Sequence, residues 1–249
     1  MNVRVRMAPS PTGNLHIGTA RTALFNWLYA KKYGGTLILR IEDTDTERST
    51  KSFEQDIIDQ LKWLGIDWQE GPIRQSERLH IYEGYLRQLI ANGRAYFCDC
   101  TKEDLEAKRK YMMEAGIAPR YDGHCRDKRV VEGAHAVIRF IMPERVISFT
   151  DLVRGKIEFN MALAGDIVIA KGFKSPLYNF AVVCDDHEMA ITHVIRGEDG
   201  VPNTPKQIAL QEALGFKHPH YAHIPLILDT DRSKMSKRNA ATALKEYAE

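Results

Sequence analysis

A loop rich in proline and glycine precedes the first helical pattern of the chain and ends in His16, Ile17 and Gly18. In a parallel sheet, a loop between a strand and its helix lies at the edge where ligands bind. The helix N-terminus presents unpaired N–H groups to a phosphate, His16 can donate to a phosphate oxygen, and Gly18 lets a nucleotide approach the backbone. A histidine that only caps the helix would give the same pattern, so the loop by itself leaves both interpretations open.

A basic run from Lys234 to Arg238 is a second candidate for phosphate chemistry, because three of its five residues are cations. Such charge suits a triphosphate, whose transfer depends on charge neutralisation and on positioning. A basic run near a chain end is by itself more often a solvated surface. Here it follows a predicted strand, as the His16 loop does, so we expect both to face one cleft.

Three of the four cysteines, Cys98, Cys100 and Cys125, form a third candidate site. The chain begins with a strand pattern and no apolar export segment, and clustered thiols in such a chain indicate metal sooner than disulfides. Structural zinc takes four N, S or O ligands. Reduced, metal-free thiols are the alternative. The fourth cysteine, Cys184, ends an apolar run, Leu177–Cys184, which we interpret as a strand with Cys184 in the core.

Alternating strand and helix patterns predict the elements that position these residues. Residues 2–7 and Thr36–Ile41 are predicted strands, and a helix after Gly18 ends at Gly34. Further helices are predicted near 50–64, 76–91 and 204–214, and further strands at 190–196 and Ile224–Leu228. This order predicts an α/β fold with a doubly wound, mostly parallel sheet.

The stretch from 83 to 179 differs in character from the rest. Thr101 to Asp104 resembles a capping box that opens a charged helix. Short strand patterns follow at 136–141, 146–149, 156–159 and 166–170. We therefore expect a smaller inserted α+β domain at 83–179 between two halves of the sheet domain, 1–82 and 180–227, with the basic loop and the start of a further region at 228–249.

Composition narrows the class of protein. The chain has 249 residues, of which 44% are hydrophobic and 27% charged, with a formal net charge of +2. These values exclude a disordered chain and a polycation that coats nucleic acid indiscriminately. The longest apolar runs are too short to span a bilayer. We expect a globular, cytoplasmic protein that does not act in a membrane.

Several motifs together resemble one enzyme family. The residues His16 to Thr19 and Lys234 to Arg238 resemble the HIGH and KMSKS signatures of class I aminoacyl-tRNA synthetases, although Thr19 stands where the first signature has its second histidine. Residues 6–13, 40–45 and 194–199 resemble the bacterial type of glutamyl-tRNA synthetase, in the same order along the chain. The resemblance covers all 249 residues and implies a Rossmann-type sheet. The family continues into a stem-contact region and an anticodon-binding domain, so we expect this chain to be the catalytic N-terminal half.

The resemblance implies an ATP-dependent glutamate–tRNA ligase. L-Glutamate would attack the α-phosphate of ATP, which carries Mg²⁺, and the resulting glutamyl-adenylate would give its acyl group to the 3′ end of tRNA-Glu. The family requires its tRNA for the first step, and we expect the inserted domain to bind the acceptor end. No protein nucleophile is needed, so catalysis would depend on orientation and electrostatics. We expect a monomer.

The resemblance also implies roles for individual residues. Catalysis is assigned to His16, Lys234 and Lys237. The ATP-binding residues are Thr12, Gly13, His16, Gly18, Lys234, Met235, Ser236, Lys237 and Arg238. Two arginines at predicted strand ends, Arg6 and Arg196, suit the carboxylates of a dicarboxylic amino acid, and Glu42 suits its ammonium group. Family match adds Ala8, Ser10 and Tyr178 to this glutamate-binding set.

The fourth zinc ligand depends on which relative the chain follows. Some bacterial glutamyl enzymes use a histidine where this chain has Asp127, whereas a relative that glutamylates a modified base of tRNA-Asp uses a tyrosine that matches Tyr121. We therefore predict Cys98, Cys100, Tyr121 and Cys125 as ligands, with His124 as the alternative fourth. That relative, which needs no tRNA to activate glutamate, is the alternative function. A catalytically silent tRNA-binding protein is a third hypothesis.

Overall fold

A parallel sheet forms the centre of the computed structural model, which describes residues 2–133, 135–228 and 244. Strand β1 (Arg4–Met7) pairs with β2 (Thr36–Ile41), which pairs with β3 (Glu70–Arg74). On the other side, β9 (His193–Gly197) pairs with β10 (His220–Ile224). Thr192 donates its backbone N–H to the Arg4 carbonyl at 2.9 Å, which places β9 beside β1. The order β3-β2-β1-β9-β10 confirms the predicted doubly wound fold and puts its switch point between β1 and β9.

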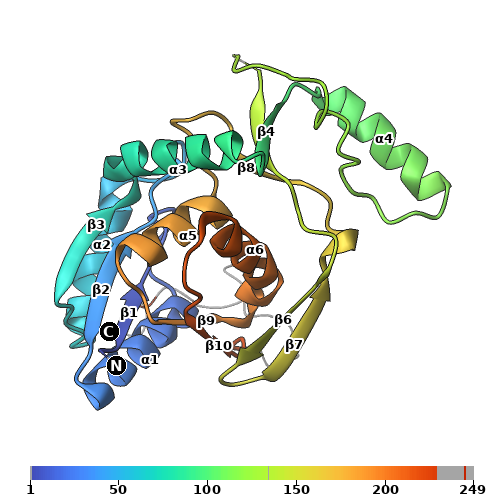
Figure 1. The fold of residues 1–249 in the computed structure, drawn as a ribbon. Helices are drawn as coiled ribbons and strands as arrows, with labels where there is room; N and C mark the ends of the chain where they lie inside the picture. The colour runs from blue at the N-terminus through green and yellow to red at the C-terminus, as the bar shows by residue number, and fades with distance from the viewer. Residues whose placement is uncertain (1, 134, 229–243, 245–249) are drawn as a thin grey trace.

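Helices connect these strands and cover the sheet (Figure 1). They are α1 (Ile17–Tyr33), α2 (Lys51–Trp63), α3 (Leu79–Ala91), α5 (Tyr178–Glu188) and α6 (Thr204–Leu214). The predicted limits of α1 are explained by its caps. His16 accepts a hydrogen bond from the backbone N–H of Thr19 at the start, and Gly34 adopts a left-handed conformation at the end, which costs glycine nothing.

The inserted stretch builds a second sheet. Strands β4 (Ala95–Cys98), β5 (Val137–Phe140) and β8 (Ile167–Ala170) pair antiparallel, and helix α4 (Lys102–Glu114) projects beside them (Figure 1). The Thr101 and Asp104 side chains form the predicted capping box at the start of α4. Strands β6 (Val146–Asp151) and β7 (Gly155–Asn160) instead form a hairpin at the edge of the main sheet, where Asp151 pairs with Tyr221 of β10. The domain boundaries stay a prediction.

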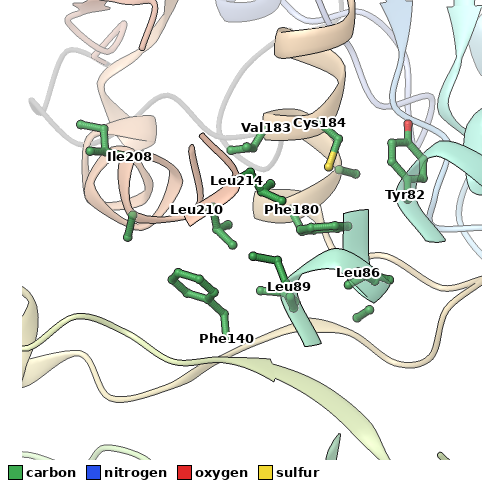
Figure 2. Packing of buried hydrophobic residues seen from close by; sticks show 14 of the residues in the cluster. Tyr82, Leu86, Leu89, Phe140, Phe180, Val183, Cys184, Ile208, Leu210 and Leu214 are labelled. Atoms are coloured by element: carbon green, nitrogen blue, oxygen red, sulfur yellow. The ribbon is translucent and has the colours of Figure 1, made fainter. Parts of the chain in front are cut away.

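The prediction that Leu177–Cys184 is a strand was wrong, because Tyr178–Glu188 is helix α5. Every residue from Phe180 to Asp186 is buried, so the helix has no polar face to reveal its period, and a short apolar run does not distinguish helix from strand. Figure 2 shows Phe180, Val183 and Cys184 of α5 packed in one cluster with Leu86 and Leu89 of α3. Cys184 is a core residue, as predicted, but in a helix.

The strand predicted at Ile224–Leu228 was also misplaced, because β10 is His220–Ile224. The segment contains two histidines, so its sequence does not have the apolar pattern of a buried strand. His223 is nevertheless fully buried, in contact with Asp151. Pro225 follows at once and has no N–H to continue the ladder. The short strands β3 and β4 were not predicted.

Candidate functional site

A cavity of about 520 Å³ opens at the carboxyl ends of β1, β2 and β9, where ligands bind in doubly wound sheets. It is lined by Arg6, Met7, Ala8, His16, Ile17, Gly18, Thr19, Arg21, Thr22, Glu42, Tyr178, Ile195, Arg196, Gly197, Asp199, Leu226 and Ile227. Seven residues predicted for the site are among these, whereas Ser10, Thr12 and Gly13 lie in the adjoining loop outside the lining. The predicted basic loop, Lys234 to Arg238, lies outside the described residues.

The N-terminus of α1 forms one wall of the cavity. His16 Nδ1 accepts the backbone N–H of Thr19 at 3.3 Å, and His16 Nε2 lies 2.8 Å from the Thr19 hydroxyl. Because Nδ1 accepts, the neutral ring carries its proton on Nε2 and donates it to Thr19. A Cβ at Gly18 would lie 3.1 Å from His16 Cε1, so glycine leaves this wall open. The exposed N–H groups of such a helix end favour an anion.

Arg6 and Glu42 enter the cavity from the ends of β1 and β2. Arg6 is buried, and its Nε donates to Asp186 Oδ1 at 3.2 Å. Its Nη1 and Nη2 have no hydrogen-bond partner among the described residues, so the charged fork is turned to the cavity. Burial raises the pKa of Glu42, and the nearby guanidinium groups of Arg40 and Arg6 oppose that rise. The two side chains therefore offer a cation and an anion side by side.

Arg40 lies beneath both residues, a role that the sequence analysis missed. It is fully buried and donates to Asp186 Oδ1 at 2.7 Å and to Glu42 Oε1 at 3.1 Å. Burial raises the pKa of Asp186, but Arg6 and Arg40 outweigh this effect and hold it below its usual range. The sequence did contain a sign that Arg40 is buried, because it is the one charged residue in the apolar segment Thr36–Ile41. Asp186 gave no such sign, because the apolar run before it was predicted to be a strand and not the helix α5.

Arg196 lies at the end of β9 on the opposite wall, and it is 8% exposed. Its Nε donates to His223 Nε2 at 3.1 Å, and its Nη2 donates to Gly200 O, Thr204 Oγ1 and Gln207 Oε1 at 2.8–3.1 Å. Its Nη1 lies 3.4 Å from the Tyr178 hydroxyl at the start of α5. A Cβ at residue 200 would lie 2.4 Å from Arg196 Nε, which explains the glycine there. The arginine is therefore fixed inside the cavity, and among the residues that the structure describes it has no ion-pair partner at the surface.

The cysteine cluster lies in the second sheet region. The Sγ atoms of Cys98, Cys100 and Cys125 all lie within 4.8 Å of one another. The Tyr121 hydroxyl is 3.3 Å from Cys98 Sγ and 3.6 Å from Cys100 Sγ, and it accepts the backbone N–H of Cys125 at 3.1 Å. Three thiols and one phenol oxygen are compatible with a four-coordinate zinc site. In the described part of the chain, His124 does not belong to this group of ligand atoms.

Burial and neighbouring side chains shift the pKa values of the thiols in this cluster. Burial raises the pKa of Cys125 to about 11. Burial also disfavours the Cys98 thiolate, but hydrogen bonds with Tyr121 and Arg139 lower the pKa of Cys98 overall. The Arg139 guanidinium lies 3.7 Å from the centre of the Tyr121 ring. A bound metal would have to displace the protons that remain.

A match to a family model shows to which family the chain belongs. The family described as tRNA synthetases class I (E and Q), catalytic domain, matches residues 2–249. The chain belongs to this family. It is 51% identical to the glutamate–tRNA ligase of Desulforamulus reducens over 99% of this chain and 55% of that protein. It is 53% identical to the glutamate–tRNA ligase of Thermodesulfovibrio yellowstonii over 98% of this chain and 53% of that protein.

Solved structures of the family share the fold. A glutamate tRNA ligase from Elizabethkingia meningosepticum, solved in complex with its amino acid, superposes with a TM-score of 0.86. It is 40% identical and covers 96% of this chain and 52% of its own. The chain thus spans about half the length of the curated relatives it matches. Within the described residues, no helix has the length and apolarity that crossing a membrane requires.

Proposed function

We propose that this protein is a glutamate–tRNA ligase, which activates L-glutamate with ATP and transfers the glutamyl group to the 3′ end of tRNA-Glu. The observation that carries the proposal is one cavity that holds two buried arginines, Arg6 and Arg196, together with Glu42 and the N-terminus of α1. Two guanidinium groups match the two carboxylates of glutamate, and Glu42 matches its ammonium group. The names of the relatives and their identity to this chain support the same substrate.

The residues supply position and charge. The N-terminus of α1, with His16 and Gly18, would bind the phosphates and the nucleoside of ATP, and Mg²⁺ would arrive with the nucleotide. A carboxylate oxygen of glutamate attacks the α-phosphorus, the bond to the bridging oxygen breaks, and pyrophosphate leaves with the electron pair. Lys234, Lys237 and Arg238 are proposed to neutralise the pyrophosphate. A ribose hydroxyl of tRNA then attacks the glutamyl carbonyl, and AMP leaves.

We also propose that Cys98, Cys100, Tyr121 and Cys125 hold a structural zinc ion. Three thiols and a phenol oxygen, brought together from the end of β4 and from the loop before β5, are the observation behind this assignment. The ion would cross-link the end of β4 to the loop before β5 and take no part in the chemistry. This region, 83–179, is our proposed binding site for the acceptor end of tRNA-Glu.

Glutamate-dependent exchange of pyrophosphate into ATP, measured with and without tRNA-Glu, tests the proposed function. The ligase of D. reducens serves as the positive control. Exchange that requires tRNA-Glu is the expected result, whereas exchange without tRNA would favour the relative that modifies tRNA-Asp. Silence of this chain where the control is active would contradict the proposal.

A variant pair tests the assignment of the site. Arg196→Ala is expected to raise the KM for glutamate at least about 10-fold, because a charged hydrogen bond contributes roughly 1.5–3 kcal/mol. The control variant Arg87→Ala changes an exposed arginine that forms an i,i+4 pair with Glu83 on α3. It should leave the KM for glutamate unchanged, and equal effects of the two variants would contradict the assignment.

A further inference from the structure

A buried histidine–aspartate pair lies directly behind Arg196. His223 of β10 and Asp151 at the end of β6 both have fully buried side chains, and His223 Nδ1 lies 2.6 Å from Asp151 Oδ2. On its other side, His223 Nε2 accepts the Arg196 Nε–H at 3.1 Å. The three residues thus form a chain of hydrogen bonds that runs from the edge hairpin into the cavity.

The direction of each hydrogen bond fixes the state of the histidine. An arginine is always a donor, so His223 Nε2 must present its lone pair and the ring proton must lie on Nδ1, where it is donated to Asp151. Asp151 is itself held by the backbone N–H groups of Val153 and Arg154, each at 3.0 Å. Because Nε2 accepts from Arg196, the ring in this arrangement is the neutral form. Burial and the nearby Arg196 charge lower the pKa of His223 and outweigh the opposing effect of Asp151.

Because the neutral His223 ring holds Arg196, the positive charge of Arg196 is not neutralised by this contact. Within the described residues, all of its hydrogen-bond partners are uncharged, and no carboxylate forms an ion pair with it. Arg196 lowers the pKa of Asp186, but the hydrogen bonds of that carboxylate go to Arg6 and Arg40. A carboxylate in place of His223 would satisfy the guanidinium within the protein. The imidazole fixes its position and leaves its positive charge for a ligand.

We infer that His223, held in one tautomer by Asp151, is a positioning residue that aims Arg196 at the substrate carboxylate and so sets the affinity for glutamate. The inference rests on the proposed function. Contacts at Nε and Nη2 fix the plane of the guanidinium and leave the Nη1 edge toward Tyr178 and the cavity. Fixing the fork in advance reduces the entropy that glutamate binding would otherwise cost.

Two substitutions separate this role from a structural one. In His223→Asn the amide reaches the position of Nδ1 and can keep the bond to Asp151, but His223 Nε2, the acceptor of the Arg196 Nε–H, is lost while the acceptors of Nη1 and Nη2 remain. In His223→Gln the longer side chain places an amide oxygen near the position of Nε2. His220→Asn is the matched control, because His220 is an exposed residue at the start of the same strand.

Binding of L-glutamate and of ATP to each variant is measured by titration calorimetry. We expect His223→Asn to raise the Kd for glutamate about 10-fold, or 1.4 kcal/mol, with an unchanged Kd for ATP. His223→Gln should recover most of the loss, and His220→Asn should match the wild type. If both His223 variants weaken ATP binding as much as glutamate binding, or if His223→Asn binds glutamate normally, the inference is overturned.

A second variant keeps the test decisive if His223→Asn does not fold. Asp151→Asn retains an oxygen for the backbone N–H groups but can offer an N–H to His223 Nδ1, which would turn a protonated Nε2 toward Arg196. It should therefore weaken glutamate binding and spare ATP binding, and an unchanged Kd for glutamate would overturn the inference. If the wild-type chain bound no glutamate, the proposed function itself would fail. Normal binding by the wild type and by every variant would refute only the positioning role.

Discussion

Removal of the Arg40 guanidinium is expected to lower the stability of the fold, because Arg40 neutralises the buried carboxylates of Glu42 and Asp186. Arg40 is fully buried, with hydrogen bonds to Asp186 and Glu42 at 2.7 and 3.1 Å and with Asp185 at 3.9 Å. Methionine can fill the space because it is unbranched and flexible. Arg40→Met would therefore leave buried carboxylates without their main counter-charge while largely preserving the volume.

The expected magnitude follows from this burial. Breaking a buried ion pair by removing one partner costs about 3–5 kcal/mol, from a total stability on the order of 5–15 kcal/mol. Without Arg40, the raised pKa of Glu42 should rise further, and the pKa of Asp186 should rise from below its usual range to above it. The folded variant would then bind more protons than its unfolded state, so its stability should fall as pH rises from 5 to 7.

Urea unfolding followed by circular dichroism at pH 5 and pH 7 measures both effects. The control is Arg48→Met, which removes an exposed arginine that pairs with Asp45, and its midpoint should equal that of the wild type. The difference between Arg40→Met and the wild type should be larger at pH 7 than at pH 5. A loss under about 1 kcal/mol, as for a surface pair, or a loss independent of pH would refute the reasoning.

Three further predictions concern the core, the cysteine cluster and pH. Leu86→Ala should lower the free energy of unfolding by about 2–5 kcal/mol in urea, because Leu86 is fully buried in the cluster of Figure 2. Gly165→Ala should weaken zinc binding in a chelator competition, since its Cβ would lie 2.7 Å from the Tyr121 carbonyl. Gly116→Ala, with a similar positive φ and open space, should not. The pKa of His223 is lower in the folded chain than in the unfolded chain, so as pH falls the unfolded chain binds a proton at this histidine before the folded chain does. The free energy of unfolding should therefore fall as pH drops below about 6.5, and the fall should be smaller in His223→Gln.

The sequence alone determined the features that depend on near neighbours. The limits of α1 and the start of α4 follow from caps a few residues away, at Gly34 and at Thr101 with Asp104. The strand patterns before Arg6 and Glu42 place both residues at carboxyl ends. The expectation of one cleft at those ends needed only the alternation of strands and helices.

The tertiary structure decided which polar residues are buried and what they touch. Arg40 and Asp186 are 146 residues apart, and His223 and Asp151 are 72 apart, so no local pattern pairs them. The same limit explains the error at α5. A helix buried on nearly every face loses the polar side that gives it a period, and its conformation is then decided by the elements packed around it. Local caps are encoded in neighbouring residues, whereas burial and charge pairing are properties of the folded chain.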